Sequence, residues 1–181
     1  ALASKVQEAV NASNKTRHAN AAKRKEFMLG TNQFPNFNEK ADGKTPACGC
    51  KCGCGEHEEA GITALDKSRL ASEFEALRLA TEGAAKQPVA FMLTIGNLAM
   101  RQARAQFSCN FLACAGYKVI DNLGFATVEE GVEEAVKAGA DIVVICSSDD
   151  EYAEFAIPAY KALDGRAMFV VAGAPACADE L

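Results

Sequence analysis

The fold is decided by the hexapeptide DIVVIC at residues 141–146, which is apolar and β-branched through most of its length. A continuous run of this kind is typical of a strand that is covered on both faces, as in a parallel sheet. The same pattern recurs on either side of it, with apolar strand segments at residues 89–95, 117–121 and 167–172. Because helical segments of ten or more residues separate these strands, the sequence predicts right-handed crossovers and an α/β fold with a parallel sheet.

Three helices are expected between the strands, at residues 99–115, 127–138 and 149–163. In the first helix, apolar residues recur at helical spacing on one face, at Ala103, Phe107, Phe111 and Ala115. The second helix opens with Thr127 and Glu130, which have the spacing of a capping box.

Length, composition and charge indicate which classes of protein this chain can belong to. The chain has 181 residues, 49% of them hydrophobic, which suits one core plus a smaller unit. Its net charge of −5 comes without a cluster of Lys and Arg, and this argues against nucleic-acid binding. No apolar run reaches the roughly 20 residues of a membrane span, and no signal peptide is recognisable. The chain opens inside a helical pattern at Ala1, so we expect it to belong to a longer protein.

The region before the sheet is sparse in apolar residues. Residues 2–24 predict one amphipathic helix with Leu2 and Val6 on its apolar face, and residues 27–31 predict a short strand. A lone helix and strand cannot bury their apolar faces, so they must pack on another part of the protein. Residues 38–61 have the composition of a mobile loop, and residues 66–80 predict a further helix.

Four cysteines stand at alternate positions in this loop, and His57 follows them; they are Cys48, Cys50, Cys52 and Cys54. Thiolates are soft ligands that suit zinc or Cu(I), but structural zinc sites normally have two to four residues between cysteines. Two interpretations stay open, a metal site folded by the intervening glycines and a flexible, redox-labile insertion. The other four, Cys109, Cys114, Cys146 and Cys177, are expected to be reduced core thiols, as in a cytoplasmic protein.

The loop after the first strand, at Gly96 and Asn97, is where an open α/β sheet usually binds its ligand. It lacks a Gly-x-Gly-x-x-Gly motif and a phosphate-loop lysine, so the usual dinucleotide and nucleoside triphosphate sites are not expected here. Arg101 and Arg104 follow in the next helix. They are candidates for binding an anion or a partner's acid, or they lie on a solvated helix face.

The run Ser147-Ser148-Asp149-Asp150 follows the third strand. Its side-chain oxygens and negative charges suit the capping of the next helix. Catalysis by one of these residues would need a base, and the two histidines, His18 and His57, lie outside the α/β region. Capping is therefore the preferred interpretation.

With these residues identified, the chain resembles the methylmalonyl-CoA mutase family, in particular the small, non-catalytic subunits of its heterodimeric members. Residues 23–35 look like the closing strand of the family's TIM barrel. The segments that look like its C-terminal cobalamin-binding domain, which has a flavodoxin-like fold, are residues 105–125, 142–149 and 152–163. The resemblance implies three parts, a barrel remnant at 1–37, a linker with the Cys-rich insertion and one helix at 38–87, and a flavodoxin-like domain at 88–181.

The resemblance also implies a function. Enzymes of this family interconvert methylmalonyl-CoA and succinyl-CoA by a radical route that adenosylcobalamin initiates. A small subunit would pair with a large catalytic subunit, which would hold the cofactor and the substrate. The heterodimer is expected in the cytoplasm. This chain would then contribute structure rather than catalysis, and no catalytic residue is expected in it.

The family's cobalamin signature is Asp-x-His-x-x-Gly, whose His binds cobalt. The matching positions here are Ala99, Arg101 and Arg104. Alanine has no donor atom and arginine keeps its protons, so none of the three can bind cobalt. We therefore expect no cobalamin in this chain. Two alternatives remain open, a cobalamin-binding domain with altered ligation and a Cys-rich metal-binding or redox module.

Overall fold

The computed structural model describes residues 2–40, 65 and 68–178. Within them the chain forms helices and strands in the following order: α1 (Leu2–Ala22), α2 (Ser72–Glu82), β1 (Val89–Thr94), α3 (Leu98–Cys114), β2 (Lys118–Ile120), α4 (Val128–Lys137), β3 (Ile142–Cys146), α5 (Tyr152–Leu163) and β4 (Met168–Val171). From β1 onward, this alternation is the one that the sequence predicts.

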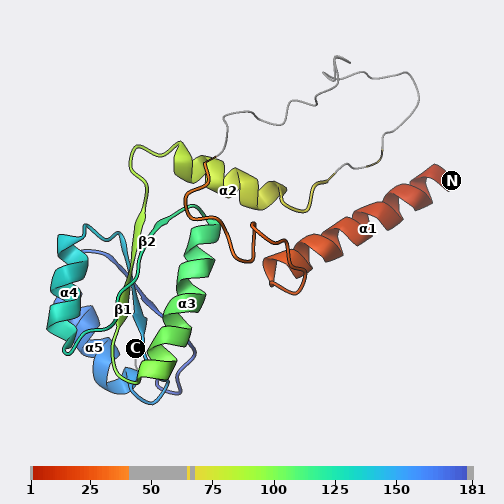
Figure 1. Ribbon diagram of the computed structural model, residues 1–181. Coiled ribbons are helices and arrows are strands. Elements are labelled where there is room, and N and C mark those ends of the chain that lie inside the picture. Colours follow the sequence, from red (N-terminus) through yellow and green to blue (C-terminus); the bar gives the residue numbers. More distant parts are fainter. Residues whose placement is uncertain (1, 41–64, 66–67, 179–181) are drawn as a thin grey trace.

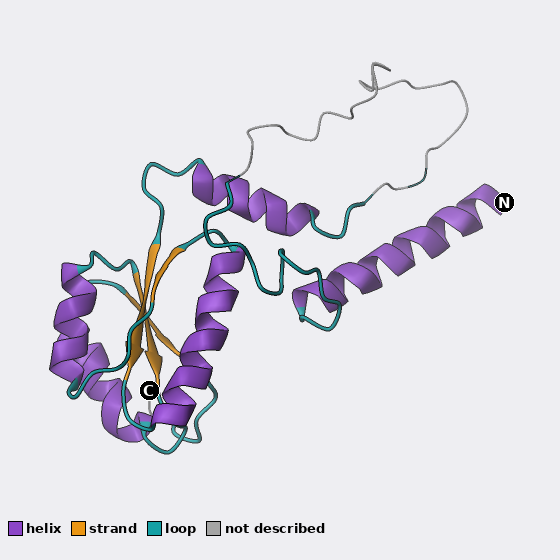
Figure 2. Ribbon diagram, in the orientation of Figure 1, coloured by secondary structure: helices purple, strands orange, loops and turns teal. Residues whose placement is uncertain are grey.

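The four strands form one parallel sheet in the order β2-β1-β3-β4. In the middle of the sheet, Phe91 of β1 is paired with Ile120 of β2 and with Val143 of β3. Helix α3 covers one face of the sheet, and α4 and α5 cover the other (Figures 1 and 2). The predicted flavodoxin-like α/β arrangement is confirmed.

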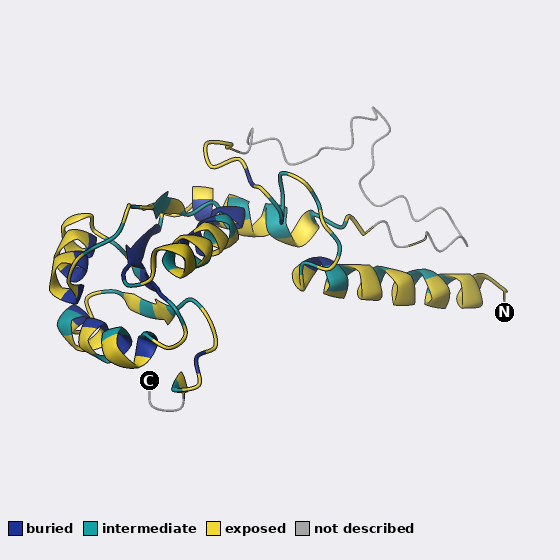
Figure 3. Cartoon of the chain, turned by 60° about the horizontal axis from the view of Figure 1, so that its bottom comes forward, coloured by how far each residue is buried: buried dark blue, intermediate teal, exposed yellow. Residues whose placement is uncertain are grey.

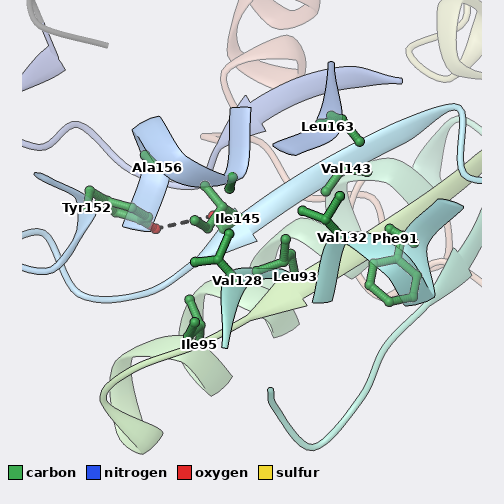
Figure 4. Packing of buried hydrophobic residues seen from close by; sticks show 12 residues of the cluster. Phe91, Leu93, Ile95, Val128, Val132, Val143, Ile145, Tyr152, Ala156 and Leu163 are labelled. Carbon is green, nitrogen blue, oxygen red and sulfur yellow. Dashed lines mark hydrogen bonds between the residues drawn. The ribbon is translucent and has the colours of Figure 1, made fainter. Parts of the chain in front are cut away.

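The larger hydrophobic core lies between the sheet and the helices α4 and α5. Leu93 of β1, Ile145 of β3 and Tyr152 of α5 have no exposed surface there. Figure 4 shows these side chains converging with Val132 of α4 and Ala156 of α5. This packing fixes the carboxyl ends of β1 and β3 relative to the start of α5.

The other face of the sheet is packed through small side chains of α3. The buried residues of this helix are Ala105, Ser108, Cys109, Ala113 and Cys114. Phe107 and Phe111 point away from the sheet, with 58% and 56% of their surface exposed and their rings 6.1 Å apart. The aromatic spacing thus marked the wrong face of this helix as the packing face, because small side chains let the helix lie close to the sheet.

The thiols of the α/β domain behave largely as expected. Cys109, Cys114 and Cys146 are buried and free, and Cys177 is half-buried. Burial raises the pKa of Cys109 and of Cys146 to about 12. These thiols are therefore protonated, unreactive members of the core.

Two helices begin later than the sequence predicts, and the N-terminus of a third helix is capped by a predicted residue. The α5 helix begins at Tyr152 rather than at residue 149, and α2 begins at Ser72 rather than at residue 66. At α4, Thr127 Oγ1 accepts a hydrogen bond from Glu130 N at 3.3 Å, and Glu130 Oε2 accepts one from Ala126 N at 3.3 Å. The Thr127 half of the predicted capping box is confirmed, whereas the Glu130 carboxylate accepts from Ala126, the residue before the N-cap, rather than from Thr127 N.

The strand predicted at residues 27–31 is not formed. The chain turns back on itself there, and an isolated bridge joins Leu29 to Gln33. The buried Asn32 holds the turn, because its Oδ1 accepts from Met28 N at 2.8 Å and its Nδ2 donates to Ala21 O at 3.0 Å. The prediction fails because a strand needs a neighbouring strand to satisfy the hydrogen bonds of its backbone N–H and C=O groups.

Helix α1 extends away from the α/β domain, and Ala21 is its one buried residue (Figures 1 and 3). His18 Nε2 lies 2.7 Å from Ser68 Oγ, which connects α1 to the segment before α2. No helix among the described residues is long and apolar enough to cross a membrane. The division into a barrel remnant, a linker and a domain stays a prediction.

Candidate functional site

The candidate site lies at the carboxyl ends of the strands, where open α/β sheets usually bind ligands. The chain passes from β1 to β2 at one edge of the sheet and from β3 to β4 at the other edge. The loops that follow the adjacent central strands β1 and β3 therefore form a topological switch point. Four loops meet at this end, after β1, β2, β3 and β4. Side chains of the protein itself connect all four.

Arg101, in the first turn of α3, connects the loop after β1 to the loop after β2. Its guanidinium donates to Gly96 O at 3.1 Å and to Leu123 O at 2.9 Å. It lies directly against Gly124, where an added Cβ would be 2.5 Å from the guanidinium carbon. Arg101 is half-buried, so the interpretation of a solvated helix face is wrong for this residue.

Arg104, one turn further along α3, connects this helix to the loops after β3 and β4. Its Nη2 donates to both carboxylate oxygens of Asp149, at 2.9 and 3.1 Å. Its guanidinium carbon would be 3.1 Å from a Cβ added at Gly173, so the group fills the space in front of that glycine. The acid that Arg104 binds therefore belongs to its own chain, and this side chain too lies off the solvated helix face.

The predicted cap at residues 147–150 is replaced by a different arrangement. Glu151 is the residue at the start of α5, and no side-chain cap bond is formed there. Instead, the hydroxyls of Ser147 and Ser148 each donate to the Glu151 carboxylate at 2.7 Å. The amide of Asn97 donates to the same carboxylate at 3.0–3.1 Å, which brings in the loop after β1. The serines thus act as donors to an acid rather than as acceptors for helix amides, so the predicted side-chain cap is wrong, although Asp149 and Asp150 do precede the start of α5.

This carboxylate should make stability depend on pH. Hydrogen bonds from the Asn97 amide and from Ser148 and Ser147 lower the pKa of Glu151 from 4.5 to about 2. Because the folded-state pKa lies below the ordinary one, the stabilisation is fully present above about pH 4.5 and is lost as the pH falls toward 2. Glu151→Gln should therefore cost about 1–2 kcal/mol of unfolding free energy at pH 6 and less at pH 3.

Urea unfolding at the two pH values measures this difference. Glu154→Gln is the matched control, since Glu154 is an exposed acid in the first turn of the same helix. A cost of Glu151→Gln that is equal at pH 6 and pH 3 would contradict the expectation.

Two further residues organise this end of the sheet, and the sequence analysis did not single them out. The Tyr152 hydroxyl accepts from Ser147 N at 3.1 Å and donates to Ala172 O at 2.7 Å, and burial raises its pKa to about 12. Asn122 Nδ2 donates to Met92 O at 2.5 Å and its Oδ1 accepts from Gly124 N at 3.1 Å. The sequence gives little indication of these two residues, because the spacing of polar residues along the chain does not show which of them are buried.

A groove of about 620 Å³ extends from this site between α3 and the edge strand β2, and Arg101, Asn122 and Leu123 are among the residues that line it. Its rim is polar, with Gln102, Gln106 and Asp121, and its floor includes Ala105 and Cys109. The groove therefore adjoins the candidate site on the side of β2.

Metal ligands are not found in the part of the chain that the structure describes, where no group of three or more His, Cys, Asp or Glu side chains could hold an ion. Cys48, Cys50, Cys52, Cys54 and His57 lie outside the described residues, as does most of the loop that contains them. The zinc site at these positions stays a prediction. His18 Nδ1 lies 3.8 Å from Glu73 Oε1, too far for a hydrogen bond that would orient the imidazole as a catalytic base.

Comparison with known proteins identifies relatives of this chain. Over 179 residues, 97% of its length, the chain is 63% identical to the methylmalonyl-CoA mutase small subunit of Porphyromonas gingivalis (strain ATCC BAA-308 / W83). The chain is homologous to a segment of the methylmalonyl-CoA mutase small subunits. It is also 27% identical over 151 residues, 81% of its length, to the methylmalonyl-CoA mutase small subunit of Streptomyces virginiae. No protein-family model matches the chain.

The chain spans 28% of the length of the first of these mutase small subunits and 23% of the second. Its resemblance to the mutase small subunits is therefore confirmed along nearly all of the chain, but for a limited part of each relative. Arg101 and Arg104, which we expect at positions of the family's cobalamin signature, are both bound to the chain's own loops.

Proposed function

We propose that this chain is a non-catalytic, structural part of a methylmalonyl-CoA mutase, the isomerase that interconverts methylmalonyl-CoA and succinyl-CoA. A large catalytic subunit would hold adenosylcobalamin and the substrate, in a cytoplasmic heterodimer. The observation that carries this proposal is the anchoring of Arg101 and Arg104 across the ligand end of the sheet.

The residues at this site do not fit cobalamin. The cobalt ligand of the family's signature would be at position 101, where a guanidinium stays protonated and has no lone pair to give. That group is also committed to two backbone carbonyls, and Arg104 is committed to Asp149. Both arginines rest on glycines, Gly124 and Gly173, so they occupy the space that those glycines leave open. Loss of the ligand and filling of the space both act against the cofactor.

Gel filtration after addition of hydroxocobalamin tests the proposal, with the visible spectrum as the readout. The chain alone should show no saturable spectral shift at micromolar concentration and should elute without cobalamin. When the chain is co-expressed with the large subunit, the two should elute together, and cobalamin should elute with the complex. A saturable shift that survives gel filtration of the chain alone would instead favour a cobalamin-binding domain with altered ligation. Separate elution of the two proteins would contradict the proposed partner.

A variant series sharpens the cobalamin part of this experiment. Arg101→His alone should not restore binding, because Ala99 lacks the acid of the signature and Arg104 still fills the space before Gly173. The triple variant Ala99→Asp, Arg101→His and Arg104→Gly removes all three departures. Its binding should exceed that of the single variant, and equal binding by the two would count against the role assigned to Arg104.

A further inference from the structure

Glu151 is where the loops after the two central strands meet. Its carboxylate accepts from the Asn97 amide of the loop after β1 at 3.0–3.1 Å. From the loop after β3 it accepts the Ser147 hydroxyl at 2.7 Å, the Ser148 hydroxyl at 2.7 Å and the Ser148 amide at 3.2 Å. Four donors from two loops thus converge on one side chain, which itself belongs to the start of α5.

The position of the carboxylate also explains why a glycine, Gly96, lies in the loop after β1. Gly96 has a φ of +77°, and a Cβ added there would lie 2.7 Å from both the carboxyl carbon of Glu151 and the hydroxyl of Ser147. The carboxylate therefore fills the space directly in front of Gly96. This space lies between the two loops that border the ligand crevice of a doubly wound sheet.

We propose that Glu151 is an internal lock that holds the crevice between the loops after β1 and β3 closed. The carboxylate takes the place that the acidic group of a ligand would have in an open site, and it satisfies the donors that such a ligand would use. Opening of the crevice then requires that Asn97 and Ser148 release the carboxylate together. This role rests on the geometry of Glu151 and stands whether or not the chain pairs with a large subunit.

Amide hydrogen exchange of the full chain, followed residue by residue by NMR, tests the lock. In Glu151→Gln the side chain keeps its size but exchanges one acceptor oxygen for a donor, so it cannot serve all four donors. Exchange at the Asn97 and Ser148 amides should become at least about tenfold faster, whereas amides inside β1 and β3 report global opening and should change less. Glu154→Gln, which changes the same charge in the same helical turn, should leave exchange at Asn97 and Ser148 within about twofold of the wild type.

Equal acceleration at all amides would show that Glu151 supports only global stability, and would overturn the lock. Unchanged exchange at Asn97 and Ser148 would overturn it as well. If Glu151→Gln does not fold, Ser148→Ala provides the second test, because it keeps the carboxylate and removes one donor. That variant should accelerate exchange at Asn97 about threefold relative to the amides of β1, and no acceleration there would overturn the proposal.

Discussion

Replacing Tyr152 with phenylalanine should lower the free energy of unfolding by about 2–3 kcal/mol, although the change removes a single oxygen atom. Tyr152 has no exposed surface, and its hydroxyl bonds both to Ser147 N and to Ala172 O. Without the oxygen, the buried amide of Ser147 loses this partner, and so does the half-buried carbonyl of Ala172. A buried polar group without a partner costs its full desolvation free energy, which is larger than the net value of the bond.

Urea unfolding at pH 7 measures this effect, and Tyr160→Phe is the matched control. Tyr160 lies in the same helix with 61% of its surface exposed, so loss of its hydroxyl should change the unfolding free energy by less than about 0.5 kcal/mol. Equal values for the two variants would mean that the Tyr152 hydroxyl does not connect the loops after β3 and β4.

The order of strands and helices could be predicted because each element carries its own local signal. The β-branched run of β3 and the Thr127 cap of α4 depend on residues next to one another in sequence, and both are confirmed. Helix α3 was predicted to span nearly its observed length, but with the wrong packing face. Helical spacing placed Phe107 and Phe111 on one apolar face, whereas the buried face is built from Ala, Ser and Cys.

The candidate site was harder to predict, because its interactions join residues that are distant in the sequence. Arg101 and Arg104 were predicted to replace parts of the cobalamin signature, but Arg101 also bonds to Leu123, 22 positions further along the chain, and Arg104 bonds to Asp149, 45 positions further. Spacing on a helix says nothing about such partners, so the alternative of a solvated face could not be rejected. Glu151 was missed for the same reason, since Asn97 lies 54 positions before it.

The predicted strand at residues 27–31 failed for a related reason. Its apolar composition suits a strand, but a strand is stable only beside another one. Among the described residues the chain offers Phe27, Leu29 and Phe34 no such partner, and these side chains stay 61–81% exposed. Local composition therefore indicated a conformation that the described part of the chain does not support.

The second large effect is expected at the contact between β1 and α4. Leu93 is fully buried in the centre of the sheet and lies against Gly131 of α4. Leu93→Ala should cost about 2–5 kcal/mol, because it removes buried methyl groups and leaves a cavity that the surrounding sheet cannot close. The matched control is Leu98→Ala, since Leu98 is 56% exposed and its truncation should cost less than about 0.5 kcal/mol.

A double-mutant cycle with Gly131 can show that close packing of α4 on β1 causes this cost. A Cβ added at Gly131 would lie 3.0 Å from Leu93 Cγ and 3.1 Å from Phe125 Cδ2, so Gly131→Ala should destabilise the wild type by about 1–3 kcal/mol. In the Leu93→Ala background, the closer of these contacts is gone and the new methyl group fills part of the cavity. The double variant should therefore be at least about 1 kcal/mol more stable than the sum of the single effects predicts. Additive effects in urea unfolding would mean that the helix moves away from the sheet to accommodate each change independently.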